Sequence, residues 1–137
     1  MISIREIDHV VLRVVDTAAT LSFYIDVLGC TIERRQDELG LIQLRAGASL
    51  IDLVPVDGVL GQKGGLPPAK EGHNMDHFCL RVEPFVEQDI LDHLTHHGIT
   101  VEPAAMRFGA EGEGPSIYVN DPQGNVVELK GPPQRVA

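Results

Sequence analysis

Two histidines and two carboxylates recur at matching places along this 137-residue chain. His9 stands near the start of "IDHVVLRV" and His77 near the start of "MDHFCLRV", two stretches that share Asp, His, Leu, Arg and Val at the same positions. Asp52 lies in "LIDLV" and Glu128 in the similar "VVELK". Two imidazoles and two carboxylates form a coherent shell for a divalent transition metal and leave positions for water or substrate.

Strand alternation supports this interpretation, because it places all four candidates opposite the apolar side chains of their segments. If helices cover the apolar faces, two such units related by a pseudo-two-fold axis would bring the four polar groups together. A bound cation would then offset the repulsion between the two carboxylates. The apolar neighbours are Val10, Leu12, Val14, Ile51, Leu53, Val127 and Leu129.

The elements that must position these residues follow one order twice. A strand at about 5–14 precedes a helix over 18–27, which begins at Asp16 or Thr17 as N-cap and ends at Gly29. Strands at 30–36, 39–46 and 49–56 complete the first module, and a Gly- and Pro-rich linker covers 57–73.

The second module spans about 74–131. It opens with a strand at 74–82, continues with a helix between Pro84 and Gly98, and closes with strands at 99–103, 115–120 and 125–131. The stretch "RFGAEGEG" (107–114) is interpreted as an inserted flexible loop. The spacing between the copies grows at this insertion, as duplication followed by loop insertion predicts. We therefore expect one α+β domain over 1–137, made of two βαβββ modules.

Composition excludes several classes of protein. The chain has a formal net charge of −9, and its Lys and Arg residues are scattered, so it lacks the basic stripe of a nucleic-acid binder. No apolar run approaches the ~20 residues that span a bilayer, and no signal pattern opens the chain. These features predict a cytoplasmic protein with no membrane partner. Cys30 and Cys79 lie in apolar segments and are expected to be buried free thiols.

Strand parity also predicts which polar side chains accompany the four candidates. If the alternating apolar residues form the core, the side chains between them line the same face as the histidines and carboxylates. His93, His96 and His97, by contrast, are interpreted as a solvated helix face. The expected substrate-binding residues are Arg13, Gln43, Arg45, Arg81, Ser116 and Tyr118.

The stretches "IDHVVLRVVDTAATLSFYIDVLG" and "SIYVNDPQGNVVELKGP" resemble the opening strand and helix and the closing hairpin of the vicinal oxygen chelate superfamily. This superfamily contains glyoxalase I, methylmalonyl-CoA epimerase, fosfomycin-resistance thiol transferases, extradiol dioxygenases and bleomycin-binding proteins. The resemblance runs from residue 7 to about 132, and it implies tandem βαβββ modules forming a cupped mixed sheet around a metal cleft.

The family's metal ligands fall on His9, Asp52, His77 and Glu128. Asp52 departs from the pattern, because glyoxalase I-like members usually carry Glu there, epimerases Gln and fosfomycin enzymes His. The resemblance implies one divalent metal per site (Ni, Co, Zn, Mn or Fe). Glu128 is then the first candidate for the general base and Asp52 the second.

The implied function is a metal-dependent lyase or isomerase of glyoxalase type, acting on a small substrate that chelates the metal through adjacent oxygens. Two alternatives stay open: an iron-dependent extradiol-type dioxygenase, and a non-catalytic protein that sequesters a small molecule such as a drug. A homodimer is expected, with the modules pairing either within one chain or between two.

Overall fold

The computed structural model of the chain describes residues 1–136, without the side chains of the last two. The chain divides into two compact units, Met1–Gly72 and His73–Ala137, and each is described by itself. None of the helices in the described residues is long and apolar enough to cross a membrane.

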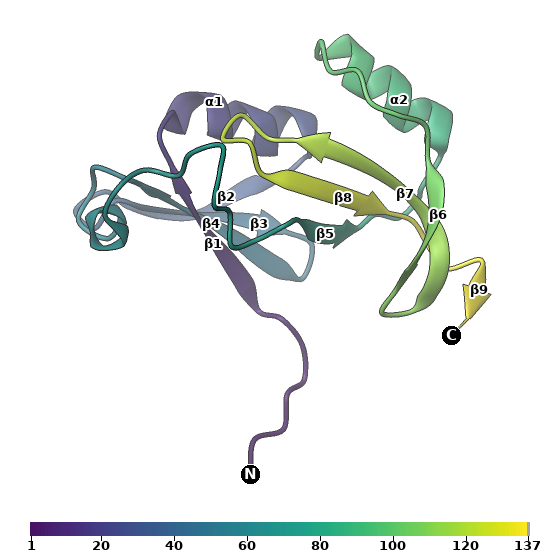
Figure 1. The fold of residues 1–137 in the computed structure, drawn as a ribbon, viewed down its shortest axis with the longest axis horizontal. Helices are drawn as coiled ribbons and strands as arrows, with labels where there is room; N and C mark the ends of the chain where they lie inside the picture. The colour runs from purple at the N-terminus through teal and green to yellow at the C-terminus, as the bar shows by residue number, and fades with distance from the viewer. Residues whose placement is uncertain (137) are drawn as a thin grey trace. The chain divides into compact units, whose positions relative to one another are not determined.

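The first unit is a four-stranded sheet with one helical segment, and its strands lie in the order β1-β4-β3-β2 (Figure 1). β1 runs parallel to β4, and the other two pairings are antiparallel. The elements are β1 (His9–Val14), α1 (Thr17–Ser22), the π-helical η1 (Phe23–Val27), β2 (Thr31–Gln36), β3 (Leu41–Ala46), β4 (Ser49–Pro55) and the 3-10 turn η2 (Gly61–Gly64).

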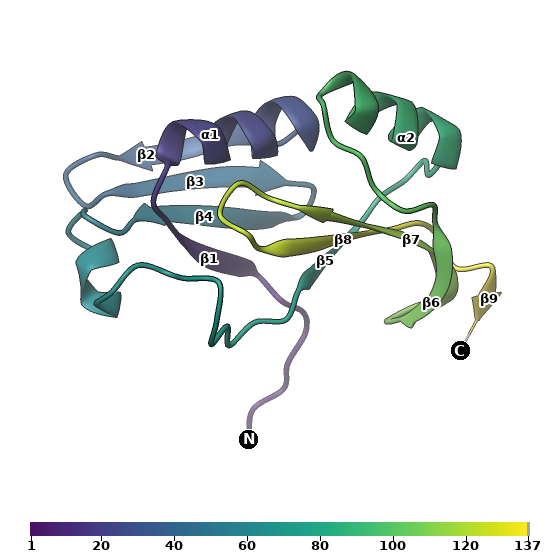
Figure 2. The ribbon, with the colours of Figure 1, turned by 45° about the horizontal axis from the view of Figure 1, so that its top comes forward.

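Local sequence accounts for the helical segment of this unit. The Asp16 carboxylate accepts a hydrogen bond from the backbone N–H of Ala19 at 3.0 Å, which caps the first turn. Gly29, with φ of +80°, ends the segment in the left-handed conformation that glycine adopts without strain. Figure 2 shows α1 and η1 lying along one face of the sheet, and the buried Phe23 and Tyr24 belong to η1.

The second unit repeats this arrangement. Its sheet has the order β5-β8-β7-β6, with β5 parallel to β8, so each position matches its counterpart in the first unit. The two βαβββ modules and the α+β class predicted from the sequence are therefore confirmed. The elements are β5 (Phe78–Arg81), α2 (Glu87–His96), β6 (Ala105–Gly109), β7 (Gly112–Asn120), β8 (Val126–Lys130) and the short β9 (Arg135–Val136), which pairs with β7.

Two predictions about the second unit were wrong. Residues 99–103 form no strand, and the stretch 107–114 is a β-hairpin instead of a flexible loop. Its glycines serve close packing: a Cβ at Gly109 would approach the Lys130 side chain to 2.6 Å, and one at Gly114 would approach the Pro132 carbonyl oxygen to 2.7 Å. Gly112, at φ +129°, turns the chain where few other residues are tolerated. The glycines therefore indicated tight contact and not mobility.

Candidate metal centre

In the first unit, His9 and Asp52 lie on the sheet face opposite the buried apolar residues. The parallel register pairs His9 with Leu50 and Val11 with Asp52, which puts both polar side chains on one side of the sheet. His9 Nε2 lies 3.9 Å from Asp52 Oδ2. The histidine side chain is 44% exposed and the aspartate side chain only 5%. The pair thus combines an accessible imidazole with a buried acid.

Asp52 is incompletely hydrogen-bonded. Gln43 Nε2 donates to Asp52 Oδ2 at 3.3 Å from the neighbouring strand. The other oxygen, Oδ1, is buried and has no hydrogen-bond partner among the described residues. A buried carboxylate oxygen without a partner is costly, and a metal ion is a partner that would remove this cost.

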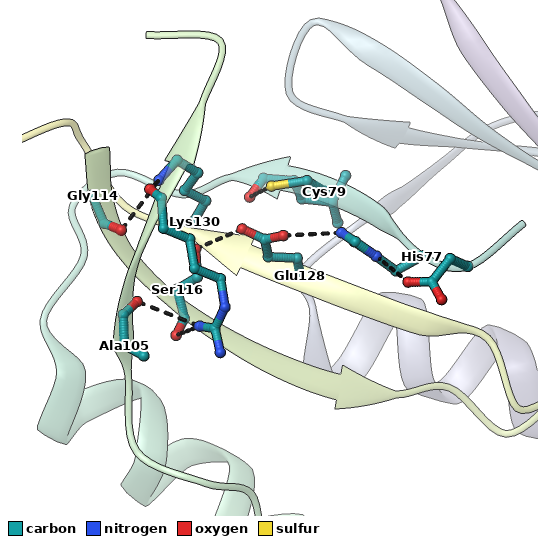
Figure 3. A network of polar contacts seen from close by, with 10 residues as sticks. His77, Cys79, Ala105, Gly114, Ser116, Glu128 and Lys130 are labelled. Carbon is teal, nitrogen blue, oxygen red and sulfur yellow. Dashed lines mark hydrogen bonds and ion pairs between the residues drawn. The ribbon is translucent and has the colours of Figure 1, made fainter. Parts of the chain in front are cut away.

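In the second unit, His77 and Glu128 occupy the equivalent face. β8 pairs with β5 on one side and β7 on the other, which sets Glu128 opposite Cys79 and Tyr118. His77 Nε2 lies 3.1 Å from Glu128 Oε1, and Ser116 Oγ donates to Glu128 Oε2 at 2.6 Å (Figure 3). Tyr118 also hydrogen-bonds to this carboxylate. Unlike Asp52, Glu128 therefore has partners for both oxygens.

Each histidine is oriented by the aspartate that precedes it. His9 Nδ1 lies 2.7 Å from Asp8 Oδ2, and His77 Nδ1 lies 2.7 Å from Asp76 Oδ2. These hydrogen bonds are the largest cause of the raised pKa of each histidine. A carboxylate on Nδ1 leaves Nε2 free to bind a metal, as in many metal sites. The roles of Asp8 and Asp76 were missed in the sequence, although the repeated "DH" pair is the signal for both.

Opposing effects act on Glu128. Burial raises the pKa of its carboxyl, whereas the Ser116 hydrogen bond and the nearby His77 lower it, and the net result is a pKa below the usual value. The pKa of the Tyr118 phenol is raised, first by burial and then by the charge of Glu128. The carboxylate is thus kept ionised by donors that surround it.

The remaining predicted site residues divide into two groups. Gln43, Ser116 and Tyr118 contact the two carboxylates, as described above. The three arginines are engaged elsewhere. Arg45 pairs with Glu33 at 3.2 Å, and Arg81 with Glu111 at 2.6 Å and Glu83 at 3.1 Å.

The guanidinium of Arg13 holds the segment that follows β4. It donates to the carbonyl oxygens of Gly61, Gly65 and Leu66 at 2.8–3.1 Å. A Cβ at Gly64 would approach this guanidinium to 2.4 Å, so glycine leaves the space that the arginine needs. Arg13 thus stabilises the first part of the linker, a use that the strand pattern could not indicate.

The cysteines behave differently from one another. Both are free thiols, as predicted, and Cys30 is buried, but Cys79 is exposed on the face that carries His77 and Glu128. Partial burial of its sulfur against the sheet and then the charge of Glu128 raise the pKa of the Cys79 thiol to about 11. At neutral pH Cys79 is therefore a thiol and a poor nucleophile.

The residues present fit a metal ion through their donor chemistry. Each unit contributes one imidazole and one carboxylate, and Asp52 Oδ1 lacks a partner within the described chain. Over residues 1–136, no group of three or more His, Cys, Asp and Glu side chains is arranged to hold an ion, and this includes His93 and His96 of α2 with the adjacent His97. Each unit thus carries one imidazole–carboxylate pair whose donor atoms suit a divalent metal.

A βαβββ module with a His and a carboxylate on the sheet face opposite its apolar core thus occurs twice in this chain. The chain matches the Glyoxalase/Bleomycin resistance protein/Dioxygenase superfamily over residues 6–129, and it belongs to this family. It is 34% identical over 128 residues to the virulence protein STM3117 of Salmonella typhimurium, an alignment that covers 92% of this chain and 83% of that protein. It is 30% identical over 135 residues to the glyoxalase domain-containing protein RDO1 of Mycosarcoma maydis, covering 93% of this chain and 69% of that protein.

Solved structures agree with this assignment. The integron cassette protein VCH_CASS1 from the mobile metagenome of V. cholerae superposes with a TM-score of 0.75 at 28% identity, covering 96% of this chain and 98% of that one. A lactoylglutathione lyase from Agrobacterium tumefaciens superposes with a TM-score of 0.65 at 22% identity, covering 92% of both chains. The second similarity concerns the fold alone.

Proposed function

We propose that this protein is a divalent-metal-dependent lyase or isomerase of glyoxalase type, acting on a small substrate that carries two adjacent oxygens. The observation that supports it is the repeated pair. On the sheet face opposite the apolar core, each unit has a histidine beside a carboxylate, and an aspartate lies against Nδ1 of each histidine. Neutral Nε2 atoms and carboxylates are ligands that suit borderline divalent metals.

His9, Asp52, His77 and Glu128 would hold the ion. When bound, it supplies Lewis acidity that polarises the two substrate oxygens and makes a neighbouring C–H easier to deprotonate. The Gln43 amide orients Asp52, and Ser116 orients Glu128. Asp8 and Asp76 fix the two imidazoles in the orientation that exposes Nε2.

Glu128 is the first candidate to take the substrate proton, and Asp52 is the second. Glu128 has a lowered pKa and is ionised at neutral pH, which is the state that a base requires. Ser116 and Tyr118 hold it in one orientation, so a proton arrives at a defined oxygen. The unpartnered Oδ1 of Asp52 leaves that acid with fewer constraints on its position.

Elemental analysis of the purified protein tests the proposal. We expect about one transition metal per chain in the wild type, and its loss in both His77→Ala and Glu128→Ala. His93→Ala is the matched control, because it removes an imidazole from α2 and should retain the metal. Nickel, cobalt, zinc or manganese would support proton transfer, whereas iron would favour the dioxygenase alternative.

A wild-type protein that stays free of metal after incubation with each of these ions would contradict the proposal and favour sequestration of a small molecule. The proposal also includes a homodimer, which sedimentation equilibrium of the wild-type protein measures directly.

A further inference from the structure

We propose that Arg107 binds an anionic group of the substrate, and that this group is a carboxylate. The inference rests on the proposed function and extends it to the class of substrate. It concerns the second unit alone, where Arg107 projects from β6 onto the face that carries Glu128, His77 and Tyr118.

Arg107 differs in its partners from four other arginines of this chain. Arg5, Arg35, Arg45 and Arg81 each pair with a carboxylate within 3.4 Å. Arg107 forms no ion pair with any carboxylate of the described residues; its Nη1 donates to the carbonyl oxygens of Ser116 at 3.0 Å and Ala105 at 3.4 Å. The chain has 20 Asp and Glu against 11 Lys and Arg, so an arginine without a carboxylate partner is not explained by a shortage of acids.

Two contacts hold the guanidinium in place, and a third fixes the backbone of the residue. Its Cζ lies 4.4 Å from the centroid of the Tyr118 ring, a stacking distance for a cation on an aromatic face. The Ser116 carbonyl fixes Nη1. The buried Lys130 donates to the carbonyl oxygen of Gly114 (Figure 3). It also donates to the carbonyl oxygen of Arg107 and so ties the two strands of the hairpin together. A guanidinium held in this way loses little conformational freedom when it binds an anion.

The same contacts connect Arg107 to the candidate metal ligands. The Ser116 backbone carbonyl accepts from Arg107, while the Ser116 hydroxyl donates to Glu128. The Tyr118 ring contacts the guanidinium and also lies edge-on to the ring of His77, with centroids 5.3 Å apart. One residue therefore separates Arg107 from each ligand, which is a suitable position to hold the remote end of a chelating substrate.

The planar fork of an arginine suits a carboxylate or a phosphate. A formal net charge of −9 opposes a dianionic phosphate more strongly than a singly charged carboxylate. The carboxylate is therefore the ligand to which the proposal commits, and phosphate is an arm of the test.

The first experiment uses metal-free protein, so it does not depend on the proposed metal. The Nε–H signals of the arginines are followed by NMR during titration with propionate, neutral propionamide and inorganic phosphate, and the Arg107 signal is assigned by its absence in Arg107→Lys. We expect a saturable shift of the Arg107 signal with propionate and none with propionamide, while the Arg35 signal serves as the control. Equal responses of Arg35 and Arg107, a response to propionamide, or a stronger response to phosphate would each overturn the proposal.

The second experiment uses zinc-loaded protein and compares malate with lactate, because both have adjacent oxygens but only malate has a second carboxylate. Loss of a charge-assisted hydrogen bond predicts that Arg107→Met weakens malate binding by about 10-fold or more and leaves lactate binding unchanged. Equal effects on both acids would indicate that Arg107 only braces the hairpin. Zinc content, measured on the same variant, separates failure of this inference from failure of the metal centre.

Discussion

The two units carry the same pair of groups on the same pair of strands, yet the pairs differ in how completely they are satisfied. In the β1–β4 pair, His9 and Asp52 are 3.9 Å apart, and one oxygen of the buried acid has no partner in the described chain. In the β5–β8 pair, His77 and Glu128 are 3.1 Å apart, and Glu128 accepts from Ser116 and Tyr118 as well.

The acid lengths account for part of this difference. Glu128 has one more methylene than Asp52 and reaches its histidine, whereas Asp52 stops short of hydrogen-bonding distance from His9. Residues on the next strand account for the rest, because Gln43 offers Asp52 one donor while Ser116 and Tyr118 both serve Glu128. The repeated fold thus carries one carboxylate with hydrogen-bond partners for both oxygens, Glu128, and one with an unpartnered buried oxygen, Asp52.

The largest expected effect comes from removing either histidine. His9→Ala and His77→Ala should each lower zinc affinity by more than about 100-fold, because loss of even an outer partner of a ligand typically costs about 10–100-fold. Competition with a chromogenic zinc chelator measures this. His93→Ala should bind zinc like the wild type. A loss in only one of the two histidine variants would confine the site to one unit and break the equivalence of the two pairs.

A smaller effect is expected from the aspartates on Nδ1. Asp8→Asn and Asp76→Asn keep a hydrogen-bond acceptor but remove the carboxylate. The hydrogen bond to that carboxylate is the largest cause of the raised pKa of each histidine, and its charge is a smaller one. Each should weaken zinc binding by about 10–100-fold. The matched control is Asp37→Asn, which affects only an exposed pair with Arg35. If the two variants retain wild-type zinc affinity, the two hydrogen bonds do not orient metal ligands.

The sequence could predict which sheet face carries the histidines and carboxylates, because a period-two pattern depends only on neighbouring residues. It placed Gln43, Ser116 and Tyr118 beside the two acids for the same reason. It could not predict which arginines are already engaged. To predict the contacts of Arg13, one must know the path of residues 61–66. To predict the position of Arg107, one must know the register of the β6–β7 hairpin, and its glycines had suggested a loop there. Such contacts depend on loop and hairpin geometry, which is difficult to predict from a single sequence.

Neutralising each acid should change the stability of the metal-free protein in opposite directions. Glu128→Gln loses charge-assisted hydrogen bonds and should lower the free energy of unfolding by about 1–3 kcal/mol. Asp52→Asn removes a buried charge with an unpartnered oxygen and should raise it by about 1 kcal/mol. Urea denaturation in the presence of a chelator measures both. A decrease in both variants would show that Asp52 is as well satisfied as Glu128, contrary to the comparison.

The smallest expected effect is a dependence on pH that reverses when metal binds. His9 and His77 both have a raised pKa, first because of Asp8 and Asp76 and further because of the charges of Asp52 and Glu128. In the metal-free protein the stability that they contribute is fully present below the unfolded pKa of about 6.5, and it is lost as the pH rises through the folded values.

Zinc requires neutral imidazoles, so protons compete with it and the loaded protein loses stability as the pH falls. Thermal unfolding at pH 5.5, 6.5 and 7.5, with chelator or with zinc, should therefore give opposite slopes. His77→Ala should reduce the slope of unfolding temperature against pH in both conditions, whereas His93→Ala should leave both slopes unchanged. Parallel slopes in the two conditions would mean that the raised pKa values belong to surface ion pairs and that zinc does not bind through these imidazoles. If the unfolding temperature changes with pH in opposite directions in the two conditions, and both changes are reduced in His77→Ala, the proton and the metal bind the same His77 imidazole.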